Sequence, residues 1–142
     1  MFGSSSATKR DAIVAMGVNH PVDSRSTSFA AEILSLTNGA GVDVVLNSLS
    51  GGDFIEKTLS ATKKEGTFVE IGKKDIWTAE QMAAHRGDVL YEVFDLLEVT
   101  RTEPGMVKAM FKDIASKMES GELTALPVQT FPLGSFLPNR LP

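Results

Sequence analysis

Two apolar runs separated by a helix-like segment, all within residues 39–76, constrain the fold more than any other part of the chain. The runs are VDVVLN at 42–47 and TFVEI at 67–71, both rich in β-branched residues and bounded by glycine. Runs of this kind are typical of buried parallel strands, and a strand, a helix and a strand in succession predict a βαβ unit. Ligands of open parallel sheets bind beyond the carboxyl ends of the strands. We therefore expect the chemistry at Asn47 and Ser48 and at residues 72–75.

Helical periodicity, capping residues and glycine stops predict further elements around this unit. The expected helices cover residues 8–16, 26–37, 88–99 and 103–120, and the expected short strands end near residue 2 and lie at 21–23 and 126–131. The last helix has the clearest signals, with Thr102 as N-cap, Pro104 in the first turn and Gly121 as stop. The alternation of strands and helices favours an α/β fold with an incomplete Rossmann-like parallel sheet and flanking helices.

The composition excludes several classes of protein. A length of 142 residues predicts one domain, and no apolar stretch approaches the ~20 residues that a membrane span needs. The net charge of -4 argues against a nucleic-acid partner. The chain has no cysteine, which excludes disulfides and thiolate metal sites and fits a cytoplasmic location. His20 and His85 are far apart in sequence and have no second ligand at metal spacing, so we predict no metal site.

A glycine-rich turn is missing from the predicted sheet. A complete dinucleotide-binding half opens with a strand, a G-x-G-x-x-G turn and a helix whose N-terminus holds the pyrophosphate. No such pattern occurs in the sequence. We therefore expect a fold that lacks its first βα unit.

Four blocks in order, VDVVLNSLSG, GTFVEIGKKDI, YEVFDL and LPVQTFPL, resemble the enoyl reductase domain of modular polyketide synthases and related fatty acid synthases. These belong to the medium-chain, zinc-independent reductase superfamily that includes quinone oxidoreductases. The resemblance covers residues 2–133 and implies reduction of an α,β-unsaturated thioester on an acyl carrier protein. NADPH would provide the hydride, a proton would be added at the α-carbon, and the neighbouring synthase domains would be partners.

The resemblance implies two catalytic residues. Lys73 matches the family's lysine after the fifth Rossmann strand, and Asp95 matches an aspartate proposed to pair with it. An ammonium near a developing enolate can stabilise its charge and donate a proton, while a carboxylate holds the lysine in place. The alternative is a surface lysine and a solvated aspartate. Asp95 interrupts an otherwise apolar segment, so its carboxylate must be exposed or paired.

The segment after the first strand suits a 2′-phosphate, because residues 4–10 combine hydroxyls, a helix N-terminus and two cations. It resembles the family's NADPH-selecting segment. Ser4, Ser5 and Lys9 are the expected contacts, with Lys9 the best match, and Arg25 is a second cationic contact. The alternative is an ordinary capped helix with exposed cations.

On the nicotinamide side, the resemblance implies that Asn47 and Ser48 face the nicotinamide ribose. Ile71 and Gly72, at the end of the second run, complete the expected cofactor residues. The alternative makes Asn47 and Ser48 plain turn residues.

The chain also departs from the family. We expect residues 1–133 to form a partial NADPH-binding domain and 134–142 an irregular tail, without the family's substrate-binding barrel. The missing first strand normally lies between the strand ending near Phe2 and that of residues 42–47, so its loss leaves two exposed sheet edges. Closing them requires rearrangement, a partner segment or a homodimer.

The leading interpretation is therefore a fragment of an NADPH-dependent enoyl reductase that is inactive alone. A second interpretation is a non-catalytic structural or dimerisation module derived from a reductase. A third is a different Rossmann-like enzyme such as a methyltransferase, in which Lys73 would have no role.

Overall fold

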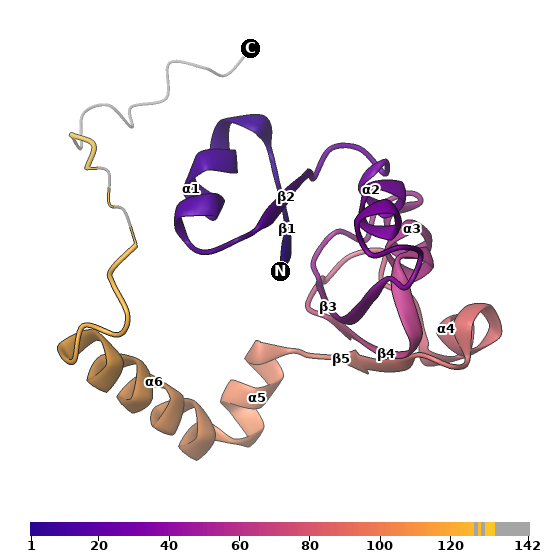
Figure 1. Cartoon of the computed structure of the whole chain (residues 1–142). Coiled ribbons are helices and arrows are strands. Elements are labelled where there is room, and N and C mark those ends of the chain that lie inside the picture. Colours follow the sequence, from indigo (N-terminus) through magenta and orange to yellow (C-terminus); the bar gives the residue numbers. More distant parts are fainter. Residues whose placement is uncertain (127, 129, 133–142) are drawn as a thin grey trace, which may run out of the picture. The chain divides into compact units, whose positions relative to one another are not determined.

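The computed structural model describes residues 1–126, 128 and 130–132, which divide into a unit of residues 1–95 and a second that starts at Leu96. The first unit contains strands and short helices in alternation (Figure 1): β1 (Phe2–Ser5), η1 (Ala7–Lys9), α1 (Arg10–Ala15), β2 (His20–Asp23), α2 (Phe29–Leu36), β3 (Val42–Asn47), α3 (Phe54–Ser60), β4 (Thr62–Glu70), α4 (Ala79–Arg86) and β5 (Leu90–Val93). The second contains α5 (Leu96–Thr102) and α6 (Pro104–Glu119). No described helix is long and apolar enough to cross a membrane.

All strand pairs are parallel, which confirms the predicted α/β class. One sheet has the order β1-β2 and the other β3-β4-β5. In the larger sheet, Asn47 lies opposite Glu70, and Glu70 lies opposite Val93. Three strands therefore end side by side, and the loops that follow them start from one edge.

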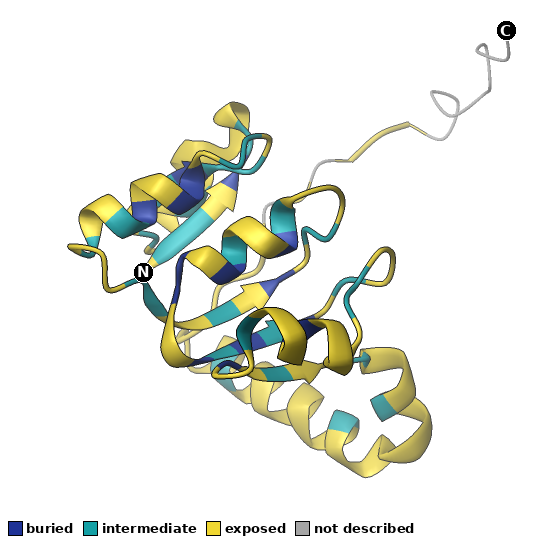
Figure 2. Ribbon diagram, turned by 90° about the vertical axis from the view of Figure 1, so that its right-hand side faces the viewer, coloured by how far each residue is buried: buried dark blue, intermediate teal, exposed yellow. Residues whose placement is uncertain are grey.

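The core of the first unit consists of two clusters of buried apolar side chains. The first combines β2 and α2 with the end of α3, and its members are Val22, Phe29, Ala30, Ile33 and Ala61. The second joins α3 and α4 to β4, and its members are Ile55, Leu59, Phe68, Met82 and Val89. Figure 2 shows buried positions, in dark blue, on both helices and strands. Helix α3 contributes side chains to the second cluster and leads into Ala61 of the first, so it links the two.

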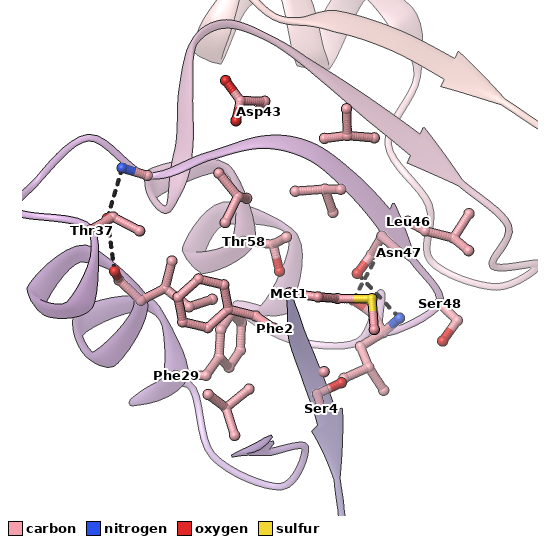
Figure 3. A pocket seen from close by; sticks show the side chains of 18 residues that line it. Met1, Phe2, Ser4, Phe29, Thr37, Asp43, Leu46, Asn47, Ser48 and Thr58 are labelled. Carbon is pink, nitrogen blue, oxygen red and sulfur yellow. Dashed lines mark hydrogen bonds between the residues drawn. The ribbon is translucent and has the colours of Figure 1, made fainter. Parts of the chain in front are cut away.

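Strands β1 and β3 do not pair with each other within the described residues. A cavity of about 560 Å³ lies between them, lined by residues 1–4 on one side and 41–49 on the other. Figure 3 shows Phe2 and Ser4 of β1 and Leu46 and Asn47 of β3 around this cavity, with Phe29 of α2 beneath. The two edges expected from the missing βα unit are therefore present.

The prediction of a helix over residues 88–99 is wrong. Residues 90–93 form strand β5, and only from Leu96 does the chain become helical. Residues 90–93 pair in parallel with Thr67–Glu70 of β4, and this pairing satisfies the backbone along their length. Pairing with a neighbouring strand thus outweighs a periodicity of apolar residues that resembles a helix.

Helix α6 confirms the predicted helix over 103–120, with one correction at its start. Thr102 is the last residue of α5, where its hydroxyl donates to the Glu98 carbonyl, and Glu103 occupies the N-cap. Apolar side chains of α6 are exposed within the described structure, namely Met110, Phe111, Ile114 and Met118. An amphipathic helix can form from local preferences while its apolar face has no cover.

Other predicted bounds need smaller corrections. The helix expected over 8–16 is divided into η1 and α1, and that over 26–37 shortens to Phe29–Leu36. Strand β4 starts earlier than expected, at Thr62, and α4 was not predicted. The strand expected over 126–131 includes residues 127 and 129, which lie outside the described residues, as does the predicted tail over 134–142.

Arg86, the last residue of α4, contacts the end of α3 and the start of β4, and we expect its loss to weaken the fold. Its guanidinium donates to the Leu59 carbonyl at 3.0 Å and to both carboxylate oxygens of Asp88 at 2.7 and 2.8 Å. The substitution Arg86→Met should lower the free energy of unfolding by about 1–2 kcal/mol, because charge-assisted hydrogen bonds to backbone and carboxylate are lost. Arg101→Met is the matched control, since its pair with Glu98 is exposed and worth little.

The same pair predicts a dependence on pH. The Arg86 guanidinium holds the pKa of Asp88 well below its ordinary value. A depressed folded-state pKa contributes stability that is present above the unfolded value of about 3.9 and is lost as the pH falls further. Chemical denaturation at several acidic pH values measures this effect. As the pH falls, the free energy of unfolding should decrease less steeply for R86M than for the unmodified chain. Parallel curves would contradict the assignment.

Candidate functional site

The candidate site lies at the carboxyl ends of β3, β4 and β5. Asn47 ends β3 and is 5% exposed, and Glu70 ends β4 and is fully buried. The Ile71 amide donates to the Asn47 carbonyl at 2.8 Å, and the Phe94 amide donates to the Glu70 carbonyl at 2.8 Å. The parallel ladder therefore continues one residue beyond each strand and fixes the start of each loop.

A buried polar cluster stands at this edge, consisting of Asn47, Glu70 and the Gly72 amide. Asn47 Nδ2 donates to Glu70 Oε2 at 2.7 Å, and the Gly72 amide donates to Glu70 Oε1 at 2.6 Å. Asn47 Nδ2 also donates to the Leu49 carbonyl at 3.2 Å. The Asn47 amide group is thus occupied by protein partners, and the exposed hydroxyl at this strand end belongs to Ser48.

Lys73 and Asp95 form an ion pair. Lys73 lies in the turn after β4, and Asp95 lies two residues after the end of β5. Lys73 Nζ lies 2.5 Å from Asp95 Oδ1, and the two side chains are 58% and 44% exposed. An ion pair this exposed contributes little to stability, generally below about 1 kcal/mol. Its significance is chemical: a cation that can donate a proton is held in place by a carboxylate and remains accessible to solvent.

A second hollow, of about 690 Å³, collects residues that follow β2, β3 and β4. Arg25 lines it from the β2 side, Ser48 from the β3 side, and Lys74 with Asp75 from the β4 side. The Ser50 hydroxyl donates to the Lys74 carbonyl, which ties two of these loops together. A guanidinium, an ammonium and hydroxyls around one open hollow can bind an anion, although Asp75 adds an opposing charge.

The residues expected on the adenine side are only partly brought together. Ser4 lines the cavity between β1 and β3. Ser5 is 7% exposed, and its hydroxyl donates to the Ser6 carbonyl. Lys9 ends η1 and is exposed, but it lines neither the cavity nor the second hollow. Of the two cations expected on the adenine side, Arg25 lines the hollow beyond the strand ends and Lys9 does not.

On the nicotinamide side, Asn47 and Ser48 line the cavity between β1 and β3, and Ser48 also lines the second hollow. Ile71 and Gly72 line neither, and their amides are used to join the strand ends. Ser48 and Leu49 are therefore shared by both spaces.

Glu70 is a site residue that sequence reasoning missed. The signal was present, since TFVEI places a carboxylate inside an apolar run, where it must find donors. The donors come from a side chain 23 positions earlier and from a backbone amide, which no local pattern reveals.

The pKa of the Tyr91 phenol depends on the buried carboxylate of Glu70. Burial raises the pKa of the Tyr91 phenol above its ordinary value, and the Glu70 charge raises it further. A raised folded-state pKa contributes stability that is present below the unfolded value of about 10 and is lost as the pH rises through the folded value. Tyr91 is the chain's one tyrosine, so tyrosinate absorbance titrates it alone. We expect the apparent pKa to fall, but not to the ordinary value, in Glu70→Gln. An unchanged titration would contradict the coupling.

The described residues do not fit a protein-bound metal. No group of three or more His, Asp or Glu side chains lies close enough among them to hold an ion. The chain has no cysteine and two histidines.

Comparison with known proteins gives concordant matches. A family described as zinc-binding dehydrogenase matches residues 16–136. The chain is 38% identical over 133 residues to the phenolphthiocerol synthesis polyketide synthase type I Pks15/1 of Mycobacterium bovis, covering 92% of this chain and 6% of that protein. It is 37% identical over 133 residues to the pikromycin polyketide synthase component PikAII of Streptomyces venezuelae, covering 92% and 4%. The chain thus spans less than a tenth of these curated relatives.

Two solved structures are similar over most of the chain. The CurK enoyl reductase superimposes with a TM-score of 0.85 at 40% identity, covering 94% of this chain and 40% of that one. The nucleotide-binding subdomain of the enoylreductase domain of PpsC from Mycobacterium tuberculosis has a TM-score of 0.73 at 35% identity, covering 88% of this chain and 71% of that one.

Proposed function

The chain belongs to the zinc-binding dehydrogenase family and, within it, to the enoyl reductase domains of polyketide synthases, and from this premise we propose that it forms part of the nucleotide-binding subdomain of an NADPH-dependent enoyl reductase. The observation that carries the proposal is the ion pair of Lys73 and Asp95 beside the ends of β4 and β5. It offers a proton donor where a parallel sheet presents its ligands.

In this proposal the substrate is an α,β-unsaturated thioester on an acyl carrier protein of the same synthase. Bound NADPH supplies the hydride that is added to the β-carbon. Lys73 stabilises the negative charge that develops on the enolate and donates a proton to the α-carbon, and the neutral amine regains a proton from solvent. Asp95 holds the Lys73 ammonium in place during this step.

The residues around the second hollow fit the phosphate end of NADPH. Arg25 can pair with a 2′-phosphate, and Ser48 can bind a ribose or phosphate oxygen. Ser4 and Asn47 line the adjoining cavity, which shares Ser48 and Leu49 with this hollow. Neither space is lined by Lys9, which makes Arg25 the better candidate for selecting NADPH.

Titration of NADPH and NADH into the chain tests the cofactor part of the proposal. We expect NADPH to bind more tightly, and Arg25→Ala to reduce that preference by about tenfold, as the loss of a charge-assisted hydrogen bond implies. Arg101→Ala removes the same charge from α5 and should leave the preference unchanged. Equal affinity for both nucleotides in the unmodified chain would overturn the selectivity.

A second candidate function is a non-catalytic structural or dimerisation module. The edges of β1 and β3 that have no strand partner among the described residues favour it, because such edges add strands from other chains. This candidate predicts association at the edges and no binding of either nucleotide. Analytical ultracentrifugation in parallel with the nucleotide titration separates the two functions. Since the chain spans 40% of the CurK enoyl reductase, we expect it alone not to reduce a crotonyl thioester.

A further inference from the structure

We propose that Glu70 is the positioning residue of this site: it sets the relative positions of the three strand ends that present Asn47, Lys73 and Asp95. This role shares one assumption with the proposed function, namely that the functional site lies at these strand ends. The contacts of Glu70 themselves carry it, and they can be measured without cofactor or substrate.

Glu70 contacts all three strand ends. Its two carboxylate oxygens accept from Asn47 Nδ2 at 2.7 Å and from the Gly72 amide at 2.6 Å. Its backbone carbonyl accepts from the Phe94 amide at 2.8 Å. Lys73 follows Gly72 and Asp95 follows Phe94, so each member of the ion pair lies one residue from a hydrogen bond of Glu70.

The carboxylate is fully buried, and no ion pair among the described residues includes Glu70. Burying an ionised carboxylate is costly unless donors compensate it. The Asn47 amide and the Gly72 amide supply that compensation. Their positions are consequently fixed by a strong, charge-assisted interaction rather than by loop packing.

Gly72 is adapted to this carboxylate. A Cβ at position 72 would lie 2.6 Å from Glu70 Oε1 and 3.4 Å from its carboxyl carbon. Real Cβ atoms do not approach an oxygen so closely, so any larger residue at 72 would displace the Glu70 side chain or the turn. The close approach puts the backbone that leads to Lys73 directly against Glu70.

A carboxylate suits these contacts better than an amide. Glu70 faces two donors, and a glutamine would offer one acceptor and one donor. Its NH₂ group would therefore oppose either Asn47 Nδ2 or the Gly72 amide. Glu70→Gln keeps the shape of the side chain and breaks one of the two contacts, so it separates positioning from packing.

The experiment uses the chain with ¹⁵N in glycine and lysine. In Glu70→Gln we expect the Gly72 amide proton to move upfield, because its hydrogen bond loses the charged acceptor. We expect the Lys73 ammonium protons to exchange with water about fivefold faster, the factor that corresponds to one lost hydrogen bond. Asp95→Asn gives the reference rate for a broken ion pair. Glu92→Gln, on the exposed side of β5, is the matched control and should change neither signal.

A purely structural role would lower the melting temperature and leave the Lys73 exchange rate at its unmodified value, and that result would overturn the proposal. If Glu70→Gln does not fold, Gly72→Ala replaces it. This variant keeps the Glu70 charge and should accelerate Lys73 exchange in the same way. An unchanged rate there would also overturn the proposal. Absence of NADPH binding by the unmodified chain would count against the proposed function alone.

Discussion

Replacement of Phe68 by Ala will lower the free energy of unfolding by about 3–5 kcal/mol, the range for removing a buried aromatic ring. Phe68 is fully buried in the middle of β4, the central strand of the larger sheet. Its ring packs in the second core cluster and lies 5.9 Å from the ring of Tyr91, centroid to centroid. A domain of this size is stable by about 5–15 kcal/mol, so this one change removes a large share of the total.

Urea denaturation followed by circular dichroism measures this effect. Phe111→Ala is the matched control, because the same ring is 68% exposed on α6 and its loss should change stability by less than about 0.5 kcal/mol. Equal losses for the two variants would mean that Phe68 is not at the centre of the core.

Replacement of Lys73 by Met will slow reduction of an enoyl thioester by about 10²–10⁴-fold in a reductase assembled around this chain, the usual contribution of a general acid. Methionine keeps the length of the side chain and removes the ammonium that would donate to the α-carbon. The ion pair with Asp95 is exposed, so the fold should keep its stability within about 1 kcal/mol.

Oxidation of NADPH in the presence of the thioester measures the rate. Lys64→Met removes the same charge from an exposed side chain of β4 that lines neither the cavity nor the second hollow, and should leave the rate unchanged. Asp95→Asn should give a smaller loss than Lys73→Met, because it leaves the donor in place. Equal rates for K73M and K64M would contradict the role of Lys73.

The local sequence predicts the strongest elements well. Strand β3 covers the predicted residues 42–47, because a β-branched run between glycines has few other conformations. The error at β5 has the opposite origin. Residues 90–93 become a strand through pairing with β4, and a helical spacing of apolar residues over 88–99 does not reveal that partner.

Less of the candidate site than of the fold can be predicted from the sequence. The roles of Lys73 and Asp95 come from the family resemblance and stay predictions, although the structure places the two side chains in contact. Glu70 could not be given a role from the sequence, because its donors come from other strand ends. The same holds for Lys9 and Arg25. The two side chains carry the same charge, and only the tertiary structure shows that Arg25 lines the second hollow and Lys9 does not.

The division of the strands into two sheets has a consequence for cooperativity. No strand hydrogen bond among the described residues joins β1 to β3, so β1 and β2 are tied to the rest through α2 and side-chain packing. Opening of the β1-β2 pair would break no backbone hydrogen bond of the larger sheet, which makes it a separate unit of local unfolding. The Ser4 side of the cavity can then lose its order while the strand ends that hold Glu70 and Lys73 stay intact.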